Sequence, residues 1–91
     1  MTNSEVSALL SEMAVLLELA AENPFRVRAY QRAAMTLGAY PRPVTELSEA
    51  ELKAIPGVGA GIAAAVREAA ATGTFADLRQ YRGRFPAGLL A

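Results

Sequence analysis

Residues 55–61 read Ile55-Pro56-Gly57-Val58-Gly59-Ala60-Gly61, and one helical pattern stops before this stretch while another starts within it. Two glycines flank one apolar residue, which indicates a tight turn between two helices with Val58 pointing into the core. The start of the second helix leaves backbone N–H groups without partners, at the positive end of the helix dipole. The sequence therefore predicts a hairpin of two helices that offers its main chain to a phosphate.

Helical patterns surround this turn on both sides. Apolar residues recur at helical spacing in each segment, and no segment alternates with period two. We expect an all-α fold, a compact bundle of four main helices plus a short one with a single helical hairpin. The expected helices span residues 3–21, 24–37, 49–54, 60–71 and 75–82.

Capping patterns set the predicted starts of these helices. A Ser or Thr followed three residues later by an acid can satisfy two free amides reciprocally, and Asn before Pro is another common start. The chain offers the pairs Thr2–Glu5, Ser48–Glu51 and Thr74–Asp77, and the dipeptide Asn23-Pro24.

Composition excludes several classes of function. The chain of 91 residues has no cysteine and no histidine, which removes disulfides, thiol nucleophiles, zinc sites and imidazole catalysis. No apolar run is long enough to span a membrane, and the first residues lack the basic start of a signal peptide. We expect a cytoplasmic, nucleoid-associated protein with no membrane partner. One domain over 1–84 is expected, with 85–91 as a tail leading toward a downstream segment.

Charge is unevenly distributed although the net charge is zero. Residues 1–22 carry four acids and no base, whereas residues 23–45 carry four arginines and no acid. Residues 69–91 carry three arginines against one acid. The two basic stretches fit either the solvated faces of ordinary helices or a nucleic-acid surface.

The hairpin pattern resembles the helix-hairpin-helix motif of DNA repair proteins. The residues that match the motif are Leu52-x-x-Ile55-Pro56-Gly57-Val58-Gly59-x-x-Ile62-Ala63-x-x-Val66. Segments 22–34 and 72–75 extend the likeness to the small N-terminal domain of X-family DNA polymerases, such as polymerase beta, and to their bacterial branch in particular. The resemblance implies a sequence-nonspecific module that contacts the phosphate backbone or the 5′-phosphate of gapped or nicked DNA. It also implies a polymerase domain downstream, and single-stranded template near the 5′-phosphate as a further partner.

The resemblance also assigns residues to the DNA interface. It implies that main-chain carbonyls of Lys53, Ile55 and Val58 hold a Na⁺ or K⁺ ion, with no other cofactor required. Tyr30 fits core packing equally well, and Phe25 after Asn-Pro is more typical of a core anchor. The implied phosphate-binding residues are Gly57, Val58, Gly59, Ala60, Gly61, Lys53, Arg26 and Tyr30, and the further DNA contacts are Phe25, Arg28, Arg32 and Arg67.

Catalysis is not expected of this chain. Some family members remove 5′-deoxyribose phosphate through a lysine Schiff base, and the resemblance places that lysine at Ala65 and an auxiliary lysine at Gly61. A Schiff base needs a primary amine, and Lys53 carries the only side-chain amine. An alternative is a helical protein-interaction module that has lost DNA binding, which zero net charge and the loss of two lysines favour. The oligomeric state stays open.

Overall fold

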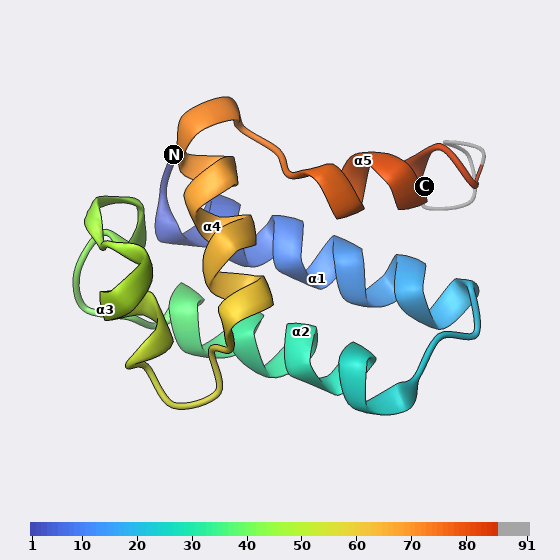
Figure 1. Ribbon diagram of the computed structural model, residues 1–91, viewed down its shortest axis with the longest axis horizontal. Coiled ribbons are helices and arrows are strands. Elements are labelled where there is room, and N and C mark those ends of the chain that lie inside the picture. The colour runs from blue at the N-terminus through green and yellow to red at the C-terminus, as the bar shows by residue number, and fades with distance from the viewer. Residues whose placement is uncertain (86–91) are drawn as a thin grey trace.

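Two long helices, α1 (Asn3–Leu19) and α2 (Pro24–Gly38), run antiparallel beside each other in the computed structural model, which describes residues 1–85 (Figure 1). The short α3 (Glu49–Lys53) and α4 (Ala60–Thr72) form the helical hairpin, and α4 runs crosswise to α1 and α2. Helix α5 (Ala76–Arg82) packs along α1. Residues 1–85 contain no strand, and the expected all-helical fold is confirmed.

One continuous core joins all of these elements. Buried side chains come from every helix, and small alanines on α2 and α4 let the helices approach closely. Val58 is buried with Ile55 and Ile62, so the hairpin turn is fixed to the core by its apolar residue, as predicted. This anchoring leaves the glycines on either side of Val58 at the surface.

Two of the three predicted capping pairs form. The Glu5 amide donates to Thr2 Oγ1 at 3.1 Å, and the Thr2 amide donates to Glu5 Oε1 at 2.8 Å. Ser48 and Glu51 repeat this exchange at 3.1 and 3.0 Å. These boxes fix the starts of α1 and α3.

The end of α1 differs from the prediction by two residues. The helix stops at Leu19, because Ala21 adopts a left-handed backbone with φ 56°. The Glu22 amide then donates to the carbonyl of Leu17, and the Ala21 amide donates to that of Glu18, each at 3.0 Å. This pair of bonds is a Schellman ending, which usually has glycine at the left-handed position.

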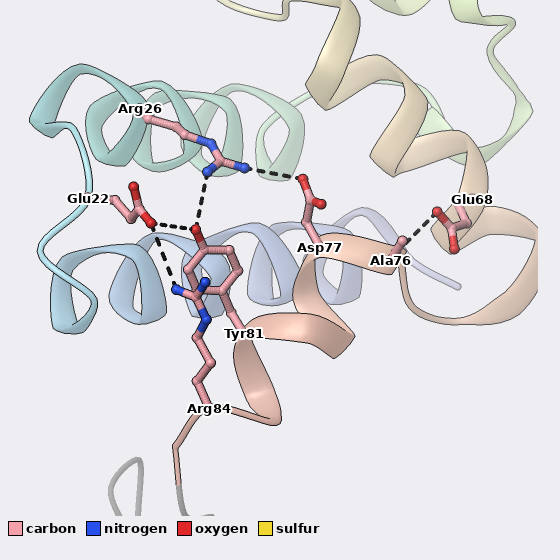
Figure 2. A network of polar contacts seen from close by, with 7 residues as sticks. All are labelled: Glu22, Arg26, Glu68, Ala76, Asp77, Tyr81 and Arg84. Carbon is pink, nitrogen blue, oxygen red and sulfur yellow. Dashed lines mark hydrogen bonds and ion pairs between the residues drawn. The ribbon is translucent and has the colours of Figure 1, made fainter.

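The predicted cap of α5 is wrong. Phe75, and not Thr74, occupies the N-cap position, and it makes no side-chain capping bond. The Thr74 hydroxyl is buried without a partner among the described residues. The free Ala76 amide instead donates to Glu68 Oε1 of α4 at 3.2 Å (Figure 2). Burial of Phe75 against Tyr30, with ring centroids 6.4 Å apart, fixes the chain where the cap would form.

The connection from α2 to α3 contains a 3-10 helix, η1 (Val44–Glu46), that the sequence did not predict. Asn3 fastens this connection to α1: its Nδ2 donates to the carbonyls of Tyr40 and Arg42, and its Oδ1 accepts from the Val44 amide at 2.9 Å. Arg67 of α4 fastens it from the other side through Nη1, which donates to the carbonyls of Thr45 and Leu47, each at 3.0 Å. The connection is therefore tied to α1 on one side and to α4 on the other.

Phe85 packs partly buried against the core, and the rest of the predicted tail, residues 86–91, lies outside the described residues. Within the described chain, no helix has both the length and the apolar character needed to cross a membrane.

Candidate nucleic-acid interface

The three glycines of the hairpin have different structural requirements. Gly57 has φ +90°, which side chains other than glycine rarely tolerate. Gly59 has φ −86° and ψ 178°, an ordinary extended geometry that any residue can adopt, so of these two glycines only Gly57 has a backbone that favours glycine. A Cβ added at Gly59 or Gly61 would meet nothing within 4 Å. These two positions are bare toward open space, and packing does not require them to be glycine.

Free amides gather at the start of α4. Its N-cap, Gly59, supplies no side-chain acceptor, and the first main-chain bond runs from the Ala63 amide to the Gly59 carbonyl at 2.9 Å. The amides of Ala60, Gly61 and Ile62 therefore have no acceptor among residues 1–85. Together with the dipole of this 13-residue helix, they give the start of α4 a positive potential that favours an anion.

The Val58 amide is not part of this group. It donates to the Ile55 carbonyl at 3.0 Å and closes the turn, so its predicted contact with a phosphate competes with a structural bond. Val58 contributes through its buried side chain, which holds the turn in place.

Arginines of α2 extend the surface beside the hairpin. The aliphatic part of Arg32 lies against the turn, because a Cβ built on Gly57 would be 3.1 Å from Arg32 Cδ. One turn earlier on α2, the Arg28 guanidinium stands 4.9 Å from the centroid of the Phe25 ring. We name Phe25, Arg28 and Arg32 the α2 ridge.

Phe25 does not belong to the core. Its side chain is 74% exposed, so its assignment to the buried face of the helix is wrong. The helical spacing of α2 places Phe25 on the side that carries Arg28 and Arg32, away from the core residues Val27 and Tyr30. An exposed aromatic ring with a cation over it is a surface on which an unpaired base can stack.

Tyr30 and Arg26 face away from the α2 ridge, toward α5. Tyr30 is only 5% exposed and stacks on Phe75, and burial raises the pKa of its hydroxyl. Arg26 Nη2 pairs with Asp77 Oδ2 at 3.2 Å, and its Nη1 lies 3.5 Å from the Tyr81 hydroxyl (Figure 2). The structure thus gives Tyr30 a packing role and gives Arg26 a partner within the chain.

The arginines near the C-terminus are also paired with acids. Arg82 binds Glu12 of α1 through two hydrogen bonds of 2.6 Å, which lower the pKa of the Glu12 carboxyl. The other two pairs of this group are Arg79–Glu68 at 3.0 Å and Arg84–Glu22 at 3.8 Å. Much of the acidic charge of the N-terminal stretch is therefore neutralised by α5 and the residues that follow it.

Three cations near the hairpin contrast with these pairs. Arg28, Arg32 and Lys53 form no ion pair with any residue in 1–85. Arg67, a further predicted DNA contact, already donates to the two carbonyls of the η1 connection. Of the two basic stretches within residues 1–85, only the one at 23–45 holds arginines that form no ion pair, and on α2 these are Arg28 and Arg32.

A family model for helix-hairpin-helix domains matches residues 1–75. The chain belongs to this family. It is also 29% identical over 90 residues to the DNA polymerase/3'-5' exonuclease PolX of Bacillus subtilis (strain 168). That alignment covers 99% of the chain but only 15% of the relative. The predicted resemblance is confirmed, and membership of this helix-hairpin-helix family indicates DNA binding at the level of the family.

Ala65 and Gly61, where the resemblance places the two lysines of the family, line one hollow of this helix-hairpin-helix domain. The hollow, of about 140 Å³, is lined by residues that include Gly61, Ala65, Phe75, Glu68 and Asp77. Its described lining holds two carboxylates and no amine, so it offers no nucleophile for a Schiff base. Ala65 is itself buried.

The turn also holds the carbonyls that the resemblance assigns to a monovalent cation. The carbonyls of Lys53 and Val58 accept no hydrogen bond from a described residue, and that of Ile55 accepts one, from the Val58 amide. Each of the three oxygens keeps at least one lone pair, and the cation site stays a prediction. No group of acidic side chains suited to a metal ion occurs in residues 1–85.

Proposed function

We propose that the chain binds DNA without sequence specificity, through the phosphate backbone. The observation that carries this proposal is the contact of Arg32 with Gly57, which joins the free amides of α4 to the unpaired cations of the α2 ridge. Main-chain amides and arginines bind phosphate oxygens but do not read bases. Lys53, exposed at the end of α3, adds a third unpaired cation to this surface.

The preferred DNA is proposed to be a gapped or nicked duplex with a 5′-phosphate. The free amides of Ala60 and Gly61 would receive a phosphate, and Phe25 would stack on an unpaired template base. A Na⁺ or K⁺ ion at the carbonyls of the turn would bridge a further phosphate. These finer assignments, and a polymerase domain downstream, rest on the family resemblance. The PolX relative is named as a polymerase and exonuclease.

The binding is expected to be weak and to depend on salt. A surface that neutralises about three to five phosphates loses affinity steeply as salt rises. Zero net charge provides little long-range attraction, so the contacts must be local.

A substitution at Gly61 tests this function apart from the fold. Gly61→Glu places a carboxylate in the first turn of α4, where open space surrounds the Cβ. A helix is stabilised by glutamate at this position, through both propensity and the dipole. DNA binding should weaken at least tenfold, while the thermal midpoint stays the same or rises. Fluorescence anisotropy with gapped DNA bearing a 5′-phosphate, at low and moderate salt, measures the first effect.

Gly61→Gln is the matched control, because it has the same size and no charge. Its affinity should stay within about threefold of that of the unmodified chain. If glutamate and glutamine have equal effects, the amides do not face a phosphate. If the unmodified chain fails to bind at low salt, the protein-interaction alternative replaces the DNA proposal.

We also propose that this module has no deoxyribose-phosphate lyase activity. The hollow at Ala65 and Gly61 lacks an amine, and Lys53 precedes the turn on a separate helix. Borohydride reduction in the presence of a 5′-deoxyribose-phosphate substrate should leave the mass of the chain unchanged. A covalent adduct formed efficiently on Lys53 would contradict this assignment.

A further inference from the structure

Helix α5 reaches α2 through a small group of polar contacts at Arg26. The Arg26 guanidinium pairs with Asp77, lies 5.9 Å from the centroid of the Tyr81 ring and approaches its hydroxyl (Figure 2). The Tyr81 hydroxyl in turn donates to Glu22 Oε1 at 2.7 Å. The Arg84 guanidinium also lies over the Tyr81 ring, 4.5 Å from its centroid.

Asp77 lies between Arg26 and the hairpin. Its side chain pairs with Arg26, and it also lines the hollow that contains Gly61. A phosphate at the free amide of Gly61 would therefore have the Asp77 carboxylate near it and the Arg26 guanidinium behind that carboxylate. Like charges repel, so Asp77 opposes a phosphate here unless Arg26 turns toward it.

The pair between Arg26 and Asp77 can be exchanged at small cost. The two side chains are 39% and 51% exposed, and ion pairs this exposed contribute little stability. A phosphate, like a carboxylate, offers the guanidinium two oxygens that can accept two parallel hydrogen bonds. Arg26 can therefore leave Asp77 for a phosphate without loss of a strong bond.

Arg26 can exchange Asp77 for a phosphate while α5 stays packed against the rest of the domain. Leu78 and Tyr81 are buried in the core, and Arg82 is held by Glu12 of α1. The bond from Tyr81 to Glu22 also remains when Arg26 moves. Only one long side chain has to change its conformation.

We infer that Asp77 of α5 is an internal competitor that withholds Arg26 from DNA, and that a bound phosphate displaces it. This inference depends on the proposed DNA binding. Helix α5 thereby lowers the affinity of the surface for DNA, because Arg26 stays paired with Asp77 until a phosphate replaces the Asp77 carboxylate.

Asp77→Asn tests the competition. The variant frees Arg26, so gapped DNA with a 5′-phosphate should bind about two- to fivefold more tightly at low salt. Arg26 contacts the same phosphate in both complexes, so the slope of log K against log salt should stay nearly the same while the affinity rises. Anisotropy titrations at several salt concentrations measure both effects, and circular dichroism checks that the helices are intact.

Two comparisons separate competition from general electrostatics. Glu12→Gln removes the same charge from the pair with Arg82, on α1, and should leave affinity and slope nearly unchanged. In an Arg26→Gln background, Asp77→Asn should give no gain. Equal tightening by Glu12→Gln, or a gain that persists without Arg26, overturns the inference.

The outcome for the proposed function is read separately. Binding that Gly61→Glu weakens but Asp77→Asn leaves unchanged overturns only the competition. Absence of binding by the unmodified chain and by Asp77→Asn overturns both.

Discussion

Gly57 and Ala21 share a left-handed backbone, with φ values of 90° and 56°, but only one of them is glycine. At Gly57 a φ of +90° strains any side chain, and an added Cβ would also press on Arg32 Cδ at 3.1 Å. At Ala21 the Schellman ending of α1 forces the same geometry on an exposed alanine. A non-glycine residue in this region costs about 1–2 kcal/mol, so α1 ends in a strained position.

Ala21→Gly should therefore stabilise the fold by about 0.5–1 kcal/mol, after the larger entropy of glycine in the unfolded chain is subtracted. Urea denaturation followed by circular dichroism measures the shift. Ala39→Gly is the matched control, because this exposed alanine at the end of α2 has φ −97° and gains nothing from glycine. If both variants lose stability equally, the strain at Ala21 is not real.

At the scale of elements, local patterns predicted the helices α1, α2, α3 and α4. The Thr2–Glu5 and Ser48–Glu51 boxes form, Asn23 caps α2, and the glycines mark the hairpin. What the sequence missed depends on contacts between distant residues. The η1 connection is held by Asn3 and Arg67, which are far from it along the chain. Local propensity carries no trace of such bonds.

The site shows the same division between local and distant information. The bare glycines and the inward Val58 follow from the turn pattern, and the structure places them as expected. The availability of each arginine does not follow from the sequence, because it depends on which acid the docking of α5 brings near. Arg26 and Arg28 are two residues apart on one helix, yet among the described residues only Arg26 forms an ion pair.

At the scale of the whole molecule, zero net charge results from two different arrangements. Helix α5 and its continuation pair their arginines with acids of the body, whereas the α2 ridge and Lys53 keep their charge. The net charge does not distinguish paired from unpaired arginines, so a neutral chain can present a basic surface.

Acid should destabilise the molecule over a defined range. Hydrogen bonds lower the pKa of Glu5, Glu12, Glu51 and Glu68 below the ordinary 4.5, with Arg82 as the main partner of Glu12. The unfolded chain then takes up protons first, so the stability is present above pH 4.5 and is lost as pH falls through the lower, folded values. Thermal midpoints should be flat from about pH 7 to 5.5 and fall between about pH 4.5 and 3.

Glu12→Gln provides the control for this pH dependence. It removes one of the four carboxyls, so the fall on acidification should be smaller than in the unmodified chain. A midpoint that stays constant down to about pH 3 would show that these hydrogen bonds do not affect stability.

The docking of α5 also determines where this module can be cut. The family match ends at residue 75, but Leu78 and Tyr81 beyond it are buried, and Arg82 neutralises a glutamate of the first helix. A fragment that ends at residue 75 would expose the apolar surface of α1 that α5 covers. It would also remove Arg82, the partner of Glu12, and Tyr81 and Arg84, the partners of Glu22. A fragment meant for transfer into another protein must therefore extend at least to Phe85, beyond the span by which the family is recognised.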